Sequence, residues 1–189
     1  MTKSKTLYRI ASLAEVRTSG DGRTLTGWAV PFDEEAEIRS PVEGHFLEVF
    51  RKGAFARTIQ QRSNRIPLNL LHDRRTRLPI GKATTLREED RGLFAEFKVS
   101  ATTAGDEALA LVADGVPVGL SIGFTPMQDR WSRKRDRVER LEVRLEEVSI
   151  VNQPAYAGAQ VVGLRALDDP GPPPYAIDLA VARLRALQL

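Results

Sequence analysis

Ser121 lies in a short segment whose residue types suit nucleophilic catalysis. Gly119, Ser121 and Gly123 alternate with apolar residues, so in a strand these three positions share the face opposite the apolar one. A hydroxyl flanked by two glycines leaves room for another backbone, which marks Gly119 and Gly123 as candidate substrate-binding positions. The alternative is a strand packed tightly against a neighbour, in which Ser121 is simply a small residue.

His72 is the candidate base for that serine. A serine nucleophile needs a group that accepts its proton, most often an imidazole, and the sequence contains two histidines. His72 follows the apolar run 66–71, so alternation places it at the end of a buried strand that can aim it. His45 lies near Pro41 and Gly44 in a stretch expected to be a solvated loop, which makes it the weaker candidate. A structural histidine is the alternative interpretation of His72.

A carboxylate is expected to orient the imidazole and to stabilise its protonated form. Every second residue from Leu141 to Leu145 is apolar, so in a strand these side chains are expected to point into the protein interior. The same alternation places Glu147 on that side of the strand. Either Glu147 points inside, where His72 would be a suitable partner, or a β-bulge at Glu146 and Glu147 leaves both carboxylates in water. The pattern alone leaves these two interpretations open.

The order His72, Ser121, Glu147 is then that of a hydrolase triad carried on strands. Residues 119–123 also match the G-x-S-x-G pattern of α/β-hydrolases, a fold that places its histidine after the serine and a helix directly behind it. Here both histidines precede Ser121, and Pro126 interrupts the extended segment that follows. The α/β-hydrolase fold is therefore excluded, and the serine is retained as a candidate.

Strands outnumber helices in the pattern of the chain. Extended segments, with a turn at 19–22 between the first two, are predicted at residues 7–18, 24–32, 66–73, 79–86, 93–99, 116–124 and 138–151. Helices are predicted from 54 to 62 and from 103 to a stop at Gly115, and a loop is predicted at 33–45. Because strands do not alternate regularly with helices, the expected class is α+β or mainly β, a barrel with a few helices rather than a doubly wound sheet. Residues 1–166 are expected to form one domain, followed by a proline-rich linker at 167–175 and a helical tail at 176–189.

The composition excludes several classes of protein. Without cysteine the chain has no disulfide, thiolate metal site or cysteine nucleophile, and no metal site or organic cofactor is expected. No apolar run approaches the roughly 18 residues of a membrane span, and no signal peptide is apparent. The net charge is +3, and the Arg-rich stretch 130–140 contains interleaved acidic residues and one aromatic residue, Trp131. A solvated charged hairpin is therefore favoured, and nucleic-acid binding is the weakest of the functional hypotheses.

Six motifs together resemble the prohead (capsid maturation) protease family of tailed phages. They are Gly27–Phe32, Glu48–Phe55, the run LNLLHD that contains His72, Pro79–Lys82, Gly119–Phe124 and Glu147–Tyr156. No motif is unique by itself, but the ordered set, which extends over residues 7–166, is specific.

The resemblance implies a serine endopeptidase with a herpesvirus-assemblin-like fold, an antiparallel β-barrel surrounded by a few helices. The family's serine and histidine carry over to Ser121 and His72. Herpesvirus relatives use a second histidine as the third member, and this chain offers none in a suitable place, so Glu147 takes that position and Glu146 is the fallback. Such proteases act inside the procapsid, in the cytoplasm of the host bacterium, and cleave scaffold protein or the scaffolding segment of the major capsid protein, and often themselves.

The implied partners are the major capsid protein and scaffold protein, with self-association left open and no membrane involved. Residues 176–189 carry Leu179, Leu184 and Leu187 on a helix without an assigned core, which predicts a docking segment or a self-cleavage target. The alternative function is a catalytically inactive capsid-assembly or scaffold protein of the same fold.

Overall fold

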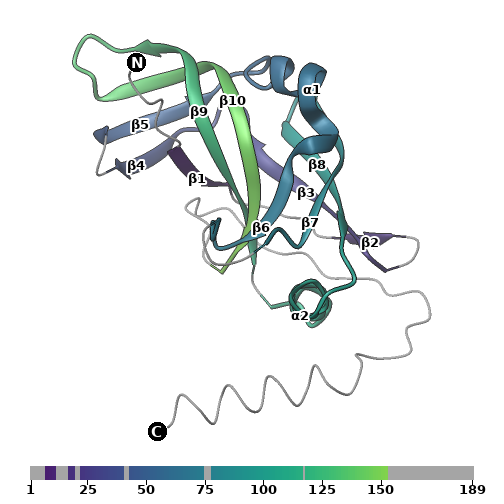
Figure 1. Cartoon of the computed structure of the whole chain (residues 1–189). Coiled ribbons are helices and arrows are strands. Elements are labelled where there is room, and N and C mark those ends of the chain that lie inside the picture. Colours follow the sequence, from purple (N-terminus) through teal and green to yellow (C-terminus); the bar gives the residue numbers. More distant parts are fainter. Residues whose placement is uncertain are drawn as a thin grey trace, which may run out of the picture.

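One sheet organises the part of the chain that the computed structural model describes, namely residues 7–11, 17–19, 22–40, 43–74, 78–116 and 118–152 (Figure 1). The strands are β1 (Leu7–Ala11), β2 (Arg17–Ser19), β3 (Thr24–Pro31), β4 (Ala36–Ser40), β5 (Gly44–Phe50), β6 (Pro67–Leu70), β7 (Gly81–Glu89), β8 (Gly92–Val99), β9 (Gly119–Trp131) and β10 (Arg137–Val151). The helices are α1 (Ala56–Arg62), the 3-10 helix η1 (Ser63–Arg65) and α2 (Thr103–Ala113). The predicted linker 167–175 and tail 176–189 lie outside the described residues.

The long strand β10 is held along both of its edges. β9 pairs with it antiparallel along one edge, and on the other edge β5 pairs in parallel with Arg137–Arg140 and β6 with Val148–Ile150. Between β5 and β6 the chain forms α1, whose Thr58 fills the gap in the ladder. The Thr58 hydroxyl donates to the carbonyl oxygen of Val143 (3.3 Å) and accepts from the backbone N–H of Leu145 (3.1 Å). The end of β10 beside β6 is therefore fixed from both sides.

The sheet is mixed and open, which corrects the expected closed antiparallel barrel. Its strand order is β1-β9-β10-β6-β7-β8-β3-β2, with β5 and β4 branching from β10. Both pairs that β10 makes with β5 and β6 are parallel. The path ends at β1 and β2, which have five and three residues, and within the described ranges no pairing joins these two ends. Such short edge strands offer few backbone groups for closure, although the sheet curls far enough for β3 to contact β9 (Figure 1).

One face of the sheet supplies the main hydrophobic core. Leu120 and Ile122 of β9 and Val148 of β10 join apolar residues of β3, β6, β7 and β8 in a single buried cluster. α2 adds Ala108 and Val112 to the same cluster. Because side chains alternate along a strand, the residues between these positions in β9 and β10 lie on the other face of the sheet.

Most of the predicted elements are confirmed. The exceptions are the strand predicted at 7–18, the loop predicted at 33–45, the strand predicted at 66–73, which ends at Leu70, and the interruption expected at Pro126, which lies inside β9. The expected strand at 7–18 is two strands, of which β1 pairs with β9 and β2 forms the predicted hairpin with β3. The expected loop at 33–45 is wrong, because it contains β4 and the start of β5, whose Ile38 and Phe46 are buried together. Neighbouring acidic residues and Pro41 conceal this short alternation in the sequence. In the described part of the chain no helix is long and apolar enough to cross a bilayer.

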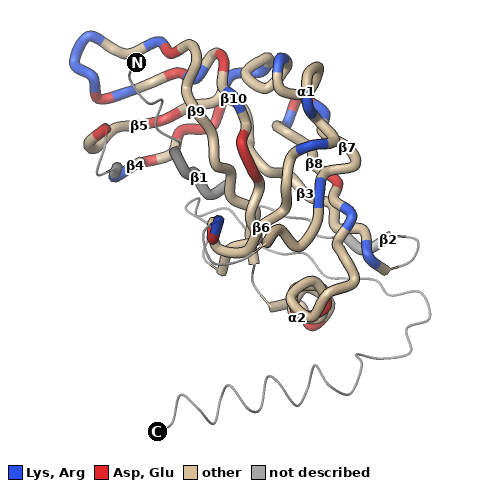
Figure 2. Tube along the Cα trace, in the orientation of Figure 1, with Lys and Arg blue, Asp and Glu red and all other residues tan. Residues whose placement is uncertain are grey.

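The hairpin between β9 and β10 carries much of the molecule's charge. Lys and Arg residues gather at its turn (Figure 2). Arg140 nevertheless is fully buried, and its guanidinium donates to Glu48 (2.7 Å), Asp129 (2.6 Å) and Glu43 (2.9 Å). The expectation of a solvated hairpin thus does not hold at Arg140, since three carboxylates replace the water that the guanidinium has lost.

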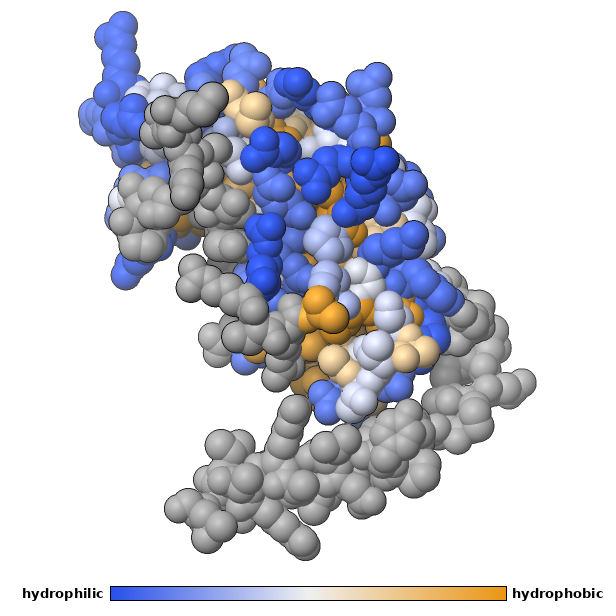
Figure 3. All heavy atoms as spheres, viewed as in Figure 1, coloured by the Kyte–Doolittle hydropathy of each residue, from blue (hydrophilic) through white to orange (hydrophobic). Residues whose placement is uncertain are grey.

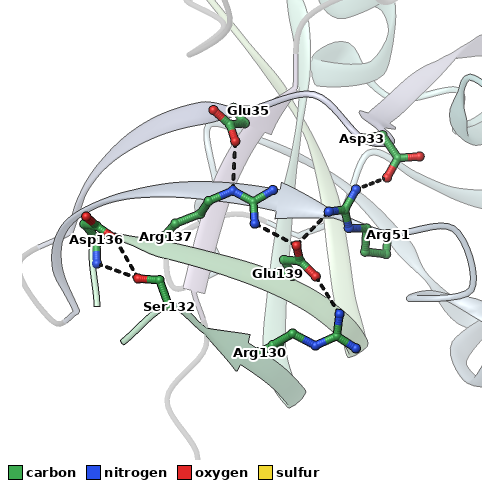
Figure 4. Close-up of polar contacts among 8 residues, drawn as sticks. All are labelled: Asp33, Glu35, Arg51, Arg130, Ser132, Asp136, Arg137 and Glu139. Atoms are coloured by element: carbon green, nitrogen blue, oxygen red, sulfur yellow. Dashed lines mark hydrogen bonds and ion pairs between the residues drawn. The ribbon is translucent and has the colours of Figure 1, made fainter. Parts of the chain in front are cut away.

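Glu139 is the centre of a second ion-pair network, which ties this hairpin to the chain around β4 and β5 (Figure 4). Its carboxylate accepts hydrogen bonds from three guanidinium groups, those of Arg51 (2.7 Å), Arg137 (2.6 Å) and Arg130 (3.1 Å). The hydrogen bond from Arg51, followed by that from Arg137, lowers the pKa of Glu139 from 4.5 to about 2.

Glu139→Gln is expected to make stability less dependent on acidic pH. Because the pKa of Glu139 is lowered by folding, its contribution is fully present above about pH 4.5 and is lost as the pH falls towards 2. The arginine partners of Glu139 are partly exposed, so solvent screens these ion pairs and limits the effect. The decrease in the free energy of unfolding from pH 6 to pH 3 should be about 1 kcal/mol larger in the original chain than in Glu139→Gln. Urea unfolding at both pH values measures the difference. Glu142→Gln, which removes a surface pair with Arg57, is the matched control, and equal pH slopes in all three proteins would contradict the expectation.

Candidate active site

Ser121 is the third residue of β9, and its position is set by both neighbouring strands. It is opposite Ser149 of β10 and Ile10 of β1. Directly opposite residues of an antiparallel pair share a face, so Ser121 and Ser149 both lie on the face away from the main core. Ser121 is fully buried. The serine therefore occupies a backbone position that strand pairing fixes.

The two glycines predicted to bind substrate flank Ser121 in the same strand. Gly123 is opposite Glu147 of β10 and Tyr8 of β1, and Gly119 is opposite Val151 at the end of β10. Both glycines are buried. A contact with substrate at Gly119 and Gly123 stays a prediction.

His72 is carried by a turn and not by the strand that was expected to extend to it. β6 ends at Leu70, and Leu71 and His72 both adopt left-handed backbone conformations, with φ of 50° and 58°. Two such non-glycine residues cost about 1–3 kcal/mol each, so the surrounding structure must hold them. β10 does so, because the carbonyl of Ile150 accepts from the Leu71 N–H (2.9 Å) and the hydroxyl of Ser149 accepts from the His72 N–H (3.2 Å).

A β-bulge brings Glu147 to the face of the sheet that carries Ser121. The pairing of β9 with β10 shifts register between Leu145 and Glu147, so Glu146 is the extra residue. Leu145 belongs to the core, and uninterrupted alternation would have sent Glu147 there as well. The bulge instead turns Glu147 to the opposite face, where it is fully buried. The two interpretations left open by the sequence are thus each half right, since the bulge exists and Glu147 is nevertheless not in water.

The fallback carboxylate, Glu146, points elsewhere. Its oxygen Oε1 accepts from Arg144 (2.6 Å) and from the hydroxyl of Thr125 (3.3 Å). Glu146 and Glu147 are adjacent in the chain but lie in different hydrogen-bond networks. Of the two, Glu147 is the one that reaches His72.

Ser121, His72 and Glu147 form one continuous relay. His72 Nδ1 lies 2.7 Å from Glu147 Oε1, and His72 Nε2 lies 2.5 Å from Ser121 Oγ. A carboxylate can only accept a hydrogen bond, so Nδ1 carries the proton that is donated to Glu147. Nε2 of the neutral ring is then the acceptor for the Ser121 hydroxyl. This arrangement can take up the serine proton and can stabilise the resulting imidazolium.

Sequence reasoning missed two polar residues that support the relay. Asn69 is buried, and its Nδ2 donates a hydrogen bond to the second carboxylate oxygen of Glu147. Nε of Arg74 lies 3.6 Å from the same oxygen. Ser149, described above, holds the backbone of the His72 turn. A signal for Asn69 was available, because a lone amide inside the apolar strand Pro67–Leu70 must find a buried partner.

The second histidine is not brought to Ser121. His45 lies in β5, which pairs with the far end of β10, and not in the expected loop. Its imidazole is exposed and lies 2.6 Å from Glu37 Oε1. Among the residues that the structure describes, no group of three or more histidine, aspartate or glutamate side chains is placed to hold a metal ion.

Comparison with known proteins gives one consistent family. A family model described as Caudovirus prohead serine protease matches residues 12–169. The prohead protease of Enterobacteria phage HK97 is 24% identical over 161 residues, which cover 82% of this chain and 66% of that protein, slightly under two thirds of its length. The solved structure of the bacteriophage T4 capsid assembly protease has the same fold, with a TM-score of 0.56 and 11% identity over 79% of this chain and 98% of that one. The chain therefore belongs to the Caudovirus prohead serine protease family, as its ordered motifs indicated.

Proposed function

We propose that this chain is a serine endopeptidase of capsid maturation in which Ser121 is the nucleophile, His72 the general base and Glu147 the group that orients His72. One observation carries the proposal. Three side chains from two strands and a turn form an unbroken hydrogen-bonded chain of 2.5 Å and 2.7 Å, in the order that nucleophilic catalysis requires.

The reaction proposed for this site is acyl transfer to Ser121. Oγ attacks the carbonyl carbon of the scissile peptide bond while its proton moves to His72 Nε2. The C–N bond then breaks as His72 returns the proton to the leaving amine, which leaves an ester on Ser121. Water, deprotonated by His72, hydrolyses the ester and restores the free hydroxyl. Throughout these steps Glu147 holds the ring orientation and offsets the imidazolium charge.

The proposed substrates are scaffold protein or the scaffolding segment of the major capsid protein, together with the protease itself. The family and the two named relatives, a prohead protease and a capsid assembly protease, support this choice. The proposed place of action is the inside of the procapsid, in the bacterial cytoplasm. Residues 167–189, which lie outside the described residues, are proposed as a self-cleavage target or a docking segment.

Co-expression with the capsid and scaffold proteins of the same phage tests the proposal, with new termini mapped by mass spectrometry. The original chain is expected to cut at defined sites. His72→Ala is expected to abolish these cuts because no other imidazole reaches Ser121 in the described structure. His45→Ala, at the exposed histidine beside Glu37, is the matched control and should leave cleavage unchanged. Identical termini with and without His72 would overturn the proposed function and would favour the inactive assembly protein.

A further inference from the structure

Three polar residues lie in register on neighbouring strands at the active site. Asn69 of β6 is paired with Ser149 of β10, and Ser149 is paired in turn with Ser121 of β9. Leu68 and Leu70, on either side of Asn69, both pack in the main core, so alternation places Asn69 on the opposite face of the sheet. That face also carries Ser121 and Ser149. β6 therefore contributes a polar side chain to the active-site face, and no step of the proposed reaction uses it.

Asn69 and Glu147 have almost no contact with water. The exposed fraction is 3% for Asn69 and 0% for Glu147. Polar side chains cover much of the face drawn in Figure 3, where water satisfies their hydrogen bonds, but these two depend on protein groups. Removing a carboxylate from water is costly unless hydrogen bonds or a nearby cation replace the lost water. The partners of both Glu147 oxygens therefore decide how well this carboxylate can serve the relay.

The two oxygens of Glu147 have different partners. Oε1 lies 2.7 Å from His72 Nδ1, and Oε2 accepts a hydrogen bond from Asn69 Nδ2. Because a carboxylate only accepts hydrogen bonds, the amide of Asn69 turns its nitrogen, and not its oxygen, towards Oε2. Nε of Arg74 also lies 3.6 Å from Oε2, but the Arg74 side chain is 45% exposed and water screens its charge. Within the described part of the chain, Asn69 is thus the buried partner that holds Oε2.

We propose that Asn69 is a positioning residue, which holds Oε2 of Glu147 so that Oε1 stays directed at His72 Nδ1. The terminal torsion of a glutamate side chain has only a broad intrinsic preference, so a single contact at Oε1 would leave the plane of the carboxylate poorly fixed. A second contact at Oε2 fixes that plane. The inference rests on the proposed function, because the orientation of Glu147 matters to the reaction only if His72 is the base. It adds a fourth side chain to the relay, one that acts through Glu147 and not on the substrate.

Asn69→Leu in the full-length chain is the first test, since leucine has nearly the same shape as asparagine and cannot donate to Oε2. We expect kcat for a cleaved capsid-derived peptide to fall by about tenfold to a hundredfold, the effect of losing a hydrogen bond to a charged group. KM should stay within about twofold, because a residue that is 3% exposed does not touch the peptide. Asn64→Leu, at an exposed asparagine of η1, is the matched control and should change neither constant.

Asn69→Asp distinguishes positioning from a merely structural role. Aspartate has the shape of asparagine, but it can donate to Glu147 only while the two carboxyl groups share a proton. As the pH rises, the shared proton is lost and the two negative charges repel each other. The ratio of kcat in Asn69→Asp to kcat in the original chain should therefore fall by about tenfold or more from pH 6 to pH 9, with the circular dichroism spectrum unchanged. The corresponding ratio for Asn69→Leu should change much less, because leucine has no proton to lose.

The proton on His72 Nδ1 gives a readout that does not need activity. Its hydrogen bond to the buried Glu147 carboxylate slows exchange with water, so it should give a low-field proton NMR signal in the full-length chain. His45→Ala, at the exposed histidine, should keep that signal. Asn69→Leu should broaden or remove the signal, because the carboxylate that accepts this proton is no longer held at Oε2, and Asn64→Leu should keep it.

The outcomes separate the role of Asn69 from the proposed function. If kcat is unchanged in Asn69→Leu, or if the ratio for Asn69→Asp does not change with pH, Asn69 does not position Glu147. The proposed function still stands in that case, provided that Ser121→Ala and His72→Ala abolish cleavage. If both of those variants cleave like the original chain, the proposed function fails and the positioning role fails with it. Should Asn69→Leu not fold, the pH dependence of Asn69→Asp decides by itself.

Discussion

Ser121→Ala is expected to lower kcat/KM for a cleaved capsid-derived peptide by about 10⁴-fold or more, with the fold retained. The substitution removes the atom that would form the acyl bond, and neither His72 nor Glu147 can replace it. The loss of structure should be small, because alanine fits the buried slot and the substitution removes a single hydroxyl group, which hydrogen-bonds to His72 Nε2. A peptidase assay measures the loss, and the intact mass after treatment with a fluorophosphonate measures whether the nucleophile is present.

Ser149→Ala is the matched control for this result. Ser149 is a buried serine directly opposite Ser121, and its hydroxyl accepts from the backbone N–H of His72. Its removal should misplace the His72 turn modestly and lower activity by about tenfold, the worth of one hydrogen bond, while fluorophosphonate labelling persists. Persistent labelling and cleavage in Ser121→Ala, or a complete loss of labelling in Ser149→Ala alone, would contradict the assignment of the nucleophile.

Glu147→Gln is expected to lower kcat by about 10⁴-fold. The amide nitrogen of glutamine can donate to His72 Nδ1, and the ring would then carry its proton on Nε2, the wrong nitrogen for accepting the Ser121 proton. The variant also loses the negative charge that stabilises the imidazolium during catalysis. The distance of 2.7 Å between His72 Nδ1 and Glu147 Oε1 makes the effect direct. Steady-state kinetics on the same peptide measures it.

Glu146→Gln separates the two adjacent glutamates. Its carboxylate lies with Arg144 and Thr125, outside the relay, so the variant should keep activity within about threefold of the original chain, as substitutions away from functional features usually do. If Glu146→Gln is as damaging as Glu147→Gln, or if Glu147→Gln is harmless, the third member of the proposed triad is assigned wrongly.

The sequence narrows the candidate residues of this site better than it predicts their geometry. Two histidines, one serine between glycines and one carboxylate out of place in an apolar pattern limit the choice of a triad to a few residues. The reason that Glu147 lies near Ser121 is different from the one that alternation suggested. Continued alternation from Leu145 pointed Glu147 into the core, whereas the bulge at Glu146 turns it to the opposite face. A bulge depends on pairing with another strand, so the pattern of one strand alone could not decide it.

The path of the sheet could not be predicted from strand patterns either. Alternation at 67–70 and 137–151 indicates strands, but β6 runs parallel to β10, and a parallel partner requires a crossover that only the folded chain reveals. The left-handed turn at Leu71 and His72 is similarly invisible, because neither residue is one that usually marks such a conformation as glycine does. Both features depend on contacts with β10 that are distant in sequence.

The dependence of the His72 turn on β10 has a consequence for the newly made protein. Within the described part of the chain β10 is the last strand of the sheet, and it supplies Glu147, the hydroxyl of Ser149 and the carbonyl of Ile150. Domains generally fold as units during synthesis, which proceeds at about 5–20 residues per second. A nascent chain that has exposed His72 and Ser121 but not yet residue 150 therefore lacks both the carboxylate and the anchor of the turn. Under the proposed function, such a chain cannot cleave a peptide until β10 has been translated.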